Sequence, residues 1–320
     1  MPRDHYVAET YLKHFVGKSG MLYAYMKSDG KKFPCHPKDI CHEWDGDIIP
    51  DFLSNPQSLA KYRKIFEPVW NPALNELQAG RVSPAEKIAL SGYIANLLVC
   101  TPPWRRIGIE GHDFQAHQFL RASDILNTER GKPDPKLKNM LAALDSGDYR
   151  IDTEPDYIRA LCARNLIKYT WGIYNADWTV IKNNTGTAFL TSDNPVSFDD
   201  PGPGPWRGGE PSFPRYVPVT PRLCLHFDIS RYGRDEANHD FTKPPKGTVR
   251  IATISARGAR RINRAVVQCA EEIVISSEQL ESIEKLVRKY ETYRVAVDFI
   301  EIRQPDGFLV GMHTRVRPVT

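Results

Sequence analysis

The sequence has no long hydrophobic run. Its longest apolar-rich stretches, residues 94–100 and 295–300, are each interrupted by a polar residue, and both are far shorter than the roughly 20 residues that a bilayer-spanning helix needs. The N-terminus, Met1-Pro2-Arg3-Asp4-His5, also lacks the apolar core of a secretory signal. These absences predict a protein without a membrane segment, and we expect it in the cytoplasm.

Cysteine is also scarce, at six in 320 residues. This is too few for a disulfide scaffold, and most of the thiols lie inside apolar stretches, where cysteine behaves as a small hydrophobic residue. We therefore expect reduced, buried thiols at Cys100, Cys162, Cys224 and Cys269.

An excess of charge of one sign is likewise missing, since 43 basic and 39 acidic residues leave a net charge of +4. Nucleic-acid binding therefore has to be inferred from local clusters and not from the total. Several catalytic fingerprints are absent too: G-x-x-x-x-G-K-[ST], G-x-S-x-G, H-E-x-x-H, and G-x-G-x-x-G after a strand. Their absence disfavours nucleotide triphosphatases, α/β-hydrolases, zincins and dinucleotide-binding enzymes.

Helical signals dominate the centre of the chain, residues 57–174. Ser83-Pro84-Ala85-Glu86 combines a serine N-cap, proline at the first helical position and glutamate three residues after the cap, which predicts a helix start. Further helices are expected from Thr153 and, separated by Gly131-Lys132-Pro133, over about 112–127 and 135–145. Before this region we expect a short helix within 5–15, a strand over 21–26 and irregular structure over 30–56.

The last part of the chain, residues 175–320, is rich in β-forming runs. Two of these runs flank Gln304-Pro305-Asp306-Gly307 and predict a hairpin. The long connection 199–214 is expected to pass over a site. The prediction is an α+β fold, with the central helical layer packed against a C-terminal, mostly antiparallel β-rich part, and residues 1–56, 57–174 and 175–320 in one compact unit. The expected elements are strands at 178–182, 188–191, 216–218, 223–228, 273–276, 293–303 and 308–316, and helices at 256–270 and 277–290.

Cys35-His36 and Cys41-His42 are the first candidate site. All four side chains are types that bind Zn²⁺. Adjacent Cys-His pairs point in different directions, however, and their spacing differs from that of structural zinc sites. We favour an ordinary loop here.

A second candidate is Thr191-Ser192-Asp193-Asn194-Pro195-Val196, which follows an apolar run. Asp193 therefore lies at the C-terminal end of an expected strand, a position where α/β sites are assembled. Asp193 and Asn194 can bind a hard cation, or act as general base and oxyanion donor. In the alternative, which the residues alone favour, the two side chains cap their own backbone in a turn.

Basic residues gather at two places. Five arginines and no acid occur between residues 250 and 264, and a helix there puts Arg257, Arg261 and Arg264 on one face. Guanidinium groups suit bidentate capture of phosphate or carboxylate. Trp104-Arg105-Arg106 adds a second basic point with a stacking surface. The alternative for both is a solvated or ion-paired surface.

Several short motifs are distributed along the whole chain: His5-Tyr6-Val7, Tyr11-Leu12-Lys13 with Phe15, Leu22-Tyr23-Ala24-Tyr25, Glu67, Thr101-Pro102 with Arg105, Thr191 to Val196, Pro218-Val219-Thr220-Pro221, and Asn263 ahead of Cys269-Ala270. Together these motifs resemble an uncharacterised bacterial family, the domain of unknown function 4238. The resemblance extends over nearly the whole chain, with Ala8 standing where the family usually has proline. It implies no activity, but it does imply that His5, Asp193 and Asn194 belong to one constellation.

The leading hypothesis is a cytoplasmic hydrolase, nuclease-like, that acts on a phosphate-bearing substrate and more on nucleic acid than on a small nucleotide. Asp193 and His5 are expected to bind a divalent metal ion or to transfer protons, Asn194 to orient the substrate, and Glu67 to add a carboxylate. The alternative is a non-catalytic module that binds RNA, DNA or a protein. The residues expected to bind the substrate are Trp104, Arg105, Arg106, Arg257, Arg261, Asn263 and Arg264.

Overall fold

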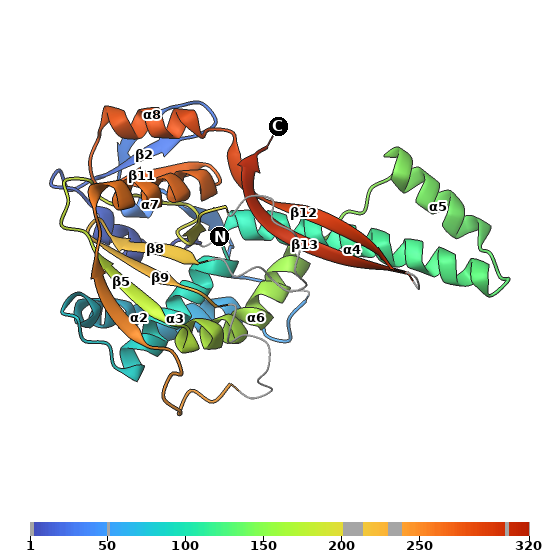
Figure 1. The fold of residues 1–320 in the computed structure, drawn as a ribbon, viewed down its shortest axis with the longest axis horizontal. Coiled ribbons are helices and arrows are strands. Elements are labelled where there is room, and N and C mark those ends of the chain that lie inside the picture. Colours follow the sequence, from blue (N-terminus) through green and yellow to red (C-terminus); the bar gives the residue numbers. More distant parts are fainter. Residues whose placement is uncertain (1–2, 50–51, 201–213, 230–238, 305–306, 320) are drawn as a thin grey trace.

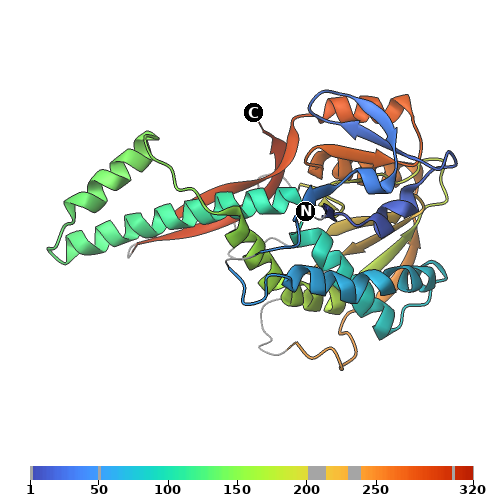
Figure 2. The ribbon, with the colours of Figure 1, turned by 180° about the vertical axis from the view of Figure 1, so that it is seen from behind.

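The computed structural model describes residues 3–49, 52–200, 214–229, 239–304 and 307–319. Figure 1 shows a body of sheets and helices, from which α4, α5 and a long hairpin extend to one side, and Figure 2 shows the same arrangement from behind. The helices are α1 (Glu9–Leu12), α2 (Ser58–Gln78), α3 (Pro84–Val99), α4 (Pro102–Glu129), α5 (Pro135–Ser146), α6 (Pro155–Asn175), α7 (Ala256–Cys269) and α8 (Glu281–Lys289), with 3-10 turns at Lys13–Phe15 and Pro37–Asp39. The strands are β1 (Arg3–His5), β2 (Leu22–Met26), β3 (Lys32–Cys35), β4 (His42–Trp44), β5 (Trp178–Lys182), β6 (Thr191–Ser192), β7 (Ser197–Phe198), β8 (Arg215–Thr220), β9 (Leu223–Phe227), β10 (Val249–Thr253), β11 (Ile273–Ser276), β12 (Tyr293–Gln304) and β13 (Gly307–Pro318).

The predicted α+β class is confirmed, and α2, α3 and α6 pack together as the helical layer of the body. Helix α3 begins as predicted: Ser83 and Glu86 form a capping box in which the backbone N–H of Ser83 donates to Glu86 at 2.9 Å. Helix α4 starts at Pro102, well before the expected residue 112, because proline in the first turn of a helix loses no hydrogen bond that the helix needs. No helix among the described residues is long and apolar enough to span a membrane.

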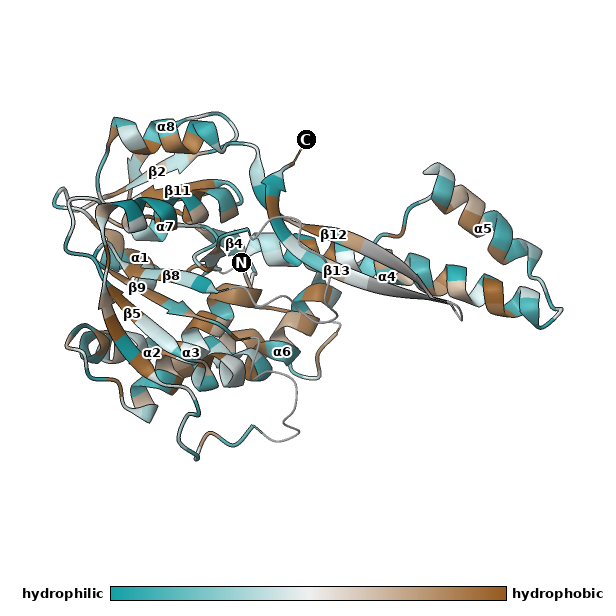
Figure 3. Cartoon of the chain, in the orientation of Figure 1, coloured by the Kyte–Doolittle hydropathy of each residue, from teal (hydrophilic) through white to brown (hydrophobic). Residues whose placement is uncertain are grey.

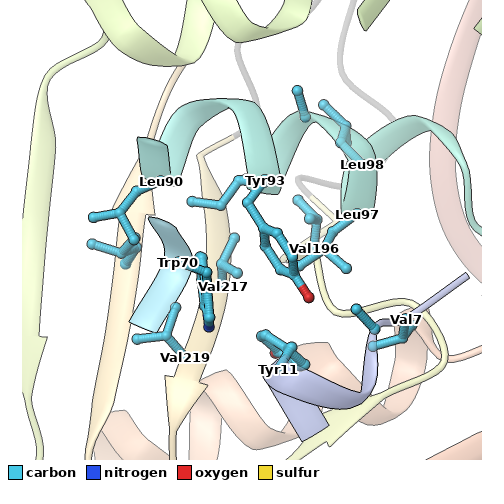
Figure 4. Close-up of a cluster of buried hydrophobic side chains, with 14 of the residues drawn as sticks. Val7, Tyr11, Trp70, Leu90, Tyr93, Leu97, Leu98, Val196, Val217 and Val219 are labelled. Atoms are coloured by element: carbon cyan, nitrogen blue, oxygen red, sulfur yellow. The ribbon is translucent and has the colours of Figure 1, made fainter. Parts of the chain in front are cut away.

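The larger sheet has the order β10-β5-β9-β8-β7, and all its pairs are antiparallel except β10 with β5. Aromatic side chains join this sheet to the helical layer. Trp70 of α2 and Tyr93 of α3 stack with ring centroids 4.2 Å apart, and Tyr11 completes the group beside Val217 and Val219 of β8 (Figure 4). Burial of such large apolar surfaces is the main stabilising contribution to the fold.

A smaller sheet, with the order β3-β2-β11-β6, joins the N-terminal strands to β11 near the C-terminus. Residues 30–56 were expected to be irregular, and this expectation is wrong: β3 pairs with β2, and β4 pairs with β1. Strand β3 is an edge strand that contains Pro34, so it lacks the alternating pattern of a paired strand. The expected strand over 188–191 is paired only at β6.

Helix α7 lies between the two sheets. Its buried face carries Ala259, Ile262 and Val266, which share one apolar cluster with Ile181 of the larger sheet and Val274 of the smaller sheet. Because this face is enclosed, the opposite face of α7 points away from the core, and Figure 3 colours much of it as hydrophilic. The arrangement of α7 therefore presents the predicted arginines to solvent.

Candidate anion-binding site

Four arginines occupy the solvent side of α7. Arg257, Arg261 and Arg264 lie on one face, as the helical spacing predicts, and Arg260 lies beside them. All four are exposed. The helix starts after Ser255, whose Oγ accepts a hydrogen bond from the backbone N–H of Gly258 at 3.2 Å. These four residues are called the arginine face below.

The arginine face lines an open depression of about 800 Å³. Helix α8 and the residue after it form its other side through Leu286, Lys289 and Tyr290. Among the described residues that line it, none is acidic. Five positive charges therefore surround one hollow, and such a concentration of positive charge attracts anions.

One carboxylate reaches the arginine face from its edge. Asp199 follows β7, and its Oδ2 accepts a hydrogen bond from Arg261 Nε at 2.8 Å while its Oδ1 lies 3.8 Å from Arg264 Nη2. Tyr216 donates its hydroxyl hydrogen to Asp199 Oδ2 at 3.3 Å. The connection 199–214 begins here, but residues 201–213 lie outside the described residues, so its expected course over a site stays a prediction.

Asp193 is buried and has a structural set of partners. Its carboxylate accepts hydrogen bonds from the backbone N–H groups of Glu271, Glu272 and Ile273 at 2.9, 2.7 and 2.8 Å. Burial raises the pKa of Asp193 to about 6, against the opposing effect of these three hydrogen bonds. The side chain thus caps the start of β11 and not its own backbone, which is the partner that the turn interpretation assigned to it.

Asn194 extends the same junction. Its Nδ2 donates to the backbone carbonyl of Cys269 at 2.8 Å, and its backbone N–H donates to Ser192 Oγ at 3.1 Å. Its Oδ1 is buried and has no hydrogen-bond partner among the described residues. Asp193 and Asn194 therefore fasten the segment after β6 to the end of α7 and the start of β11.

His5 and Glu67 lie in other parts of the N-terminal region. His5 pairs with His42 across β1 and β4, with ring centroids 5.5 Å apart, and burial lowers the pKa of its ring. Glu67 is half-buried on α2, where burial raises its pKa. No described hydrogen bond joins either side chain to Asp193, so their shared role stays a prediction. The described residues also contain no group of three or more His, Cys, Asp or Glu side chains arranged to hold a metal ion.

The Trp104-Arg105-Arg106 segment does not form a second free basic point. Arg105 Nη1 donates to both carboxylate oxygens of Glu43, at 2.9 and 2.7 Å. Arg106 binds the carboxylate of Glu271 through Nε at 2.7 Å and Nη2 at 3.0 Å. Trp104 is partly buried against the core, and the guanidinium of Arg215 lies 5.6 Å from its ring. Arg105 and Arg106 are 19% and 31% exposed and already bind carboxylates, so neither presents the free guanidinium group that was expected, and their role in binding substrate stays a prediction.

The expectation that Asn263 binds substrate requires a correction. Its side chain is buried on α7, with an exposed fraction of 5%. Its Nδ2 donates to the carbonyl of Ala188 at 2.8 Å, and its Oδ1 accepts from the N–H of Leu190 at 3.0 Å. The amide therefore holds the segment before β6 in place, and Asn263 has no access to a ligand at the arginine face.

Comparison with known families accounts for most of the chain. The model of a protein family of unknown function, DUF4238, matches residues 3–279. The chain belongs to the DUF4238 family. Within this DUF4238 protein the match includes β1, β6 and α7, and it ends before α8, so Lys289 and Tyr290 lie outside it. Neither a curated protein nor a solved structure matches the chain significantly.

Several side chains that matter to this DUF4238 protein have no visible signal in the sequence. Lys289 and Tyr290 complete the depression but lie at the end of an ordinary amphipathic helix. Arg63 is buried on α2, where it pairs with Asp47 at 2.9 Å and donates to Asn96 Oδ1 at 3.3 Å. A lone basic residue in a helical pattern gives no sign that distant acids will enclose it.

Proposed function

We propose that this DUF4238 protein binds nucleic acid through the arginine face. The observation that carries the proposal is the open depression in which four exposed arginines and Lys289 surround a volume of about 800 Å³, with no acid among its described lining residues. Guanidinium groups present paired donors that match phosphate oxygens. Clustering of such groups on one face is the electrostatic signature of a nucleic-acid surface.

The geometry of the face suits a polymer. Arg257 and Arg264 are seven residues apart on α7, so at a rise of 1.5 Å per residue they are separated by about 10 Å along the helix axis. Four successive phosphates of one strand, which are separated by three intervals of about 3.4 Å along the helix axis, cover about the same distance. Sites for small ligands instead bury most of the ligand surface in a cleft or cavity. An open hollow with several cations in a row favours a strand over a mononucleotide.

Binding without catalysis is the version of the function that the geometry supports best. The hydrolase expected from the sequence relies on Asp193 as base or metal ligand, but three backbone N–H groups occupy its carboxylate. Asp193 is also absent from the described residues that line the depression. The non-catalytic alternative needs only the arginines, and it is the one we propose.

The proposal is tested by removing the charge at the face and, separately, elsewhere. Arg257, Arg261 and Arg264 are replaced by alanine together, and the matched control replaces the exposed Lys136, Lys138 and Arg150 of the α5 arm, residues 130–150. We expect the first variant to bind single-stranded RNA and duplex DNA at least about tenfold more weakly at low salt, and the control to bind like wild type. Exposed charges contribute only about 0 to 1 kcal/mol per pair to stability, so both variants should fold.

Two outcomes contradict the proposal. If the two triple variants lose affinity equally, the effect is one of net charge and not of the arginine face. If the wild type fails to bind either nucleic acid at low salt, where electrostatic attraction is strongest, the protein does not bind nucleic acid through this surface.

A further inference from the structure

We propose that Arg261, Arg264 and Tyr216 form a phosphate subsite, that the carboxylate of Asp199 occupies it in the free protein, and that a phosphate of the bound strand displaces Asp199. This inference rests on the proposed nucleic-acid function and assigns an internal competitor to the same site. Asp199 Oδ2 lies 2.8 Å from Arg261 Nε and 3.3 Å from the hydroxyl of Tyr216, and Oδ1 lies 3.8 Å from Arg264 Nη2.

The carboxylate shows where an anion is held. Two hydrogen-bond donors, Arg261 Nε and the Tyr216 hydroxyl, and the positive charge of Arg264 converge from α7 and β8 on one pair of oxygens. Tyr216 is fixed in position because its ring stacks on His226, with centroids 4.9 Å apart. A phosphate has the same negative charge and more acceptor oxygens than a carboxylate, so the donors that hold Asp199 are suited to hold a phosphate as well.

The two ends of the arginine face differ in whether their guanidinium groups are paired with a carboxylate. Arg261 and Arg264 share Asp199, whereas Arg257 and Arg260 form no ion pair with any described residue. An incoming strand therefore meets unpaired guanidinium groups in the first two turns of α7. Once a strand is bound there, its neighbouring phosphates are present at high effective concentration beside Asp199.

The ion pairs of Asp199 are weak enough for such a strand to displace it. The side chains of Arg261 and Arg264 are 61% and 47% exposed, so water screens their attraction to Asp199. Exposed ion pairs of this kind are weak. The protein loses that attraction whenever a phosphate replaces the carboxylate, so Asp199 lowers the affinity for nucleic acid by a correspondingly small factor.

The test is a double-mutant cycle on RNA binding. Asp199→Asn keeps the size of the side chain and removes its charge, and the affinity for a labelled oligouridine RNA is measured for this variant in the wild-type and Arg261→Ala backgrounds. The matched control is Asp145→Asn, which removes one negative charge from a half-exposed carboxylate on the α5 arm, 3.2 Å from His117 Nε2. Melting temperatures of all variants confirm that they are folded.

We expect Asp199→Asn to bind the RNA about two- to fivefold more tightly than wild type, the factor that corresponds to an exposed ion pair. In the Arg261→Ala background the gain should shrink to that of Asp145→Asn, because the subsite is already broken. If Asp199→Asn gains no more than Asp145→Asn, or gains equally in both backgrounds, the subsite is overturned while the binding function stands. If neither the wild type nor Asp199→Asn binds RNA at low salt, the proposed function fails and the subsite with it.

Discussion

Arg261 Nε donates a hydrogen bond to Asp199 Oδ2 at 2.8 Å, although 62 positions separate the two residues in the sequence. The segment from 250 to 264 contains five arginines and no acid, and yet a carboxylate reaches its exposed face. The contact divides the arginine face into an end at Arg257 and Arg260, which has no ion pair with a described residue, and a paired end at Arg261 and Arg264. It also identifies the position where an anion is held.

Asp193 is predicted to be a structural residue. Asp193→Ala leaves three partly buried backbone N–H groups without an acceptor, so we expect the free energy of unfolding to fall by about 3 kcal/mol. Urea denaturation measures the loss, and Asp193→Asn, which keeps one acceptor oxygen, provides a milder variant. Asp145→Ala on the α5 arm should change stability by less than about 0.5 kcal/mol. An Asp193→Ala protein with wild-type stability would contradict the capping role.

Lys27 makes the free energy of unfolding depend on pH. It is buried, its Nζ donates to the carbonyls of Val267, Ala270 and Tyr293 at 2.9, 3.0 and 2.5 Å, and burial lowers its pKa from 10.5 to about 7. Between these two values the unfolded chain binds more protons than the folded protein. The contribution of Lys27 to the free energy of unfolding is therefore complete above pH 10.5, falls as the pH decreases, and is lost below about pH 7.

The variant Lys27→Met should remove this dependence. Urea unfolding of the wild type and the variant is measured at several pH values between about 7 and 9. We expect the free energy of unfolding of the wild type to increase relative to that of the variant as the pH rises, by at most about 1.4 kcal/mol per pH unit. Comparison of the two proteins cancels the other titrating groups, which they share. Parallel profiles would show that Lys27 has the same pKa in the folded and unfolded states.

Arg106 is expected to stabilise the fold and to leave nucleic-acid binding unchanged. Its two hydrogen bonds to Glu271 are partly shielded from water, and Nη2 also donates to the carbonyl of Val295 at 2.7 Å, which ties α4 to the hairpin. A double-mutant cycle with Arg106→Ala and Glu271→Ala should give a coupling free energy of about 1 to 2 kcal/mol. Loss of RNA affinity in a folded Arg106→Ala protein would contradict this expectation and show that Arg106 takes part in binding.

Local signals in the sequence predict much of this fold. The capping box at Ser83 and Glu86 locates the start of α3, and the β-rich run at 273–276 coincides with β11. Such signals are absent from short strands whose pairing partners are far away in the sequence. The sequences of β3 and β4 lack a regular alternation of apolar and polar residues. β4 pairs with residues 3–5, about 40 positions earlier, and neither strand alone indicates this partner.

The residues of the candidate site likewise divide into those that local sequence signals predict and those that they do not. Arg257, Arg261 and Arg264 are predictable because a helical period places them on one face. The partners of Arg106 and Asn263 lie 165 and 75 positions away, so composition within a window cannot show that these side chains are already engaged. Free and paired guanidinium groups have the same sequence signature, and only tertiary structure separates them.

The most direct test of the account is the salt dependence of nucleic-acid binding. The affinity for single-stranded RNA is measured over a range of salt concentrations for wild type, for the Arg257, Arg261 and Arg264 triple alanine variant, and for the Lys136, Lys138 and Arg150 control. If the arginine face neutralises phosphates, the slope of log affinity against log salt becomes shallower by about 0.7 for each phosphate that the first variant no longer neutralises, and it stays at the wild-type value in the control. Equal slopes for the wild type and the arginine variant would contradict binding at this face.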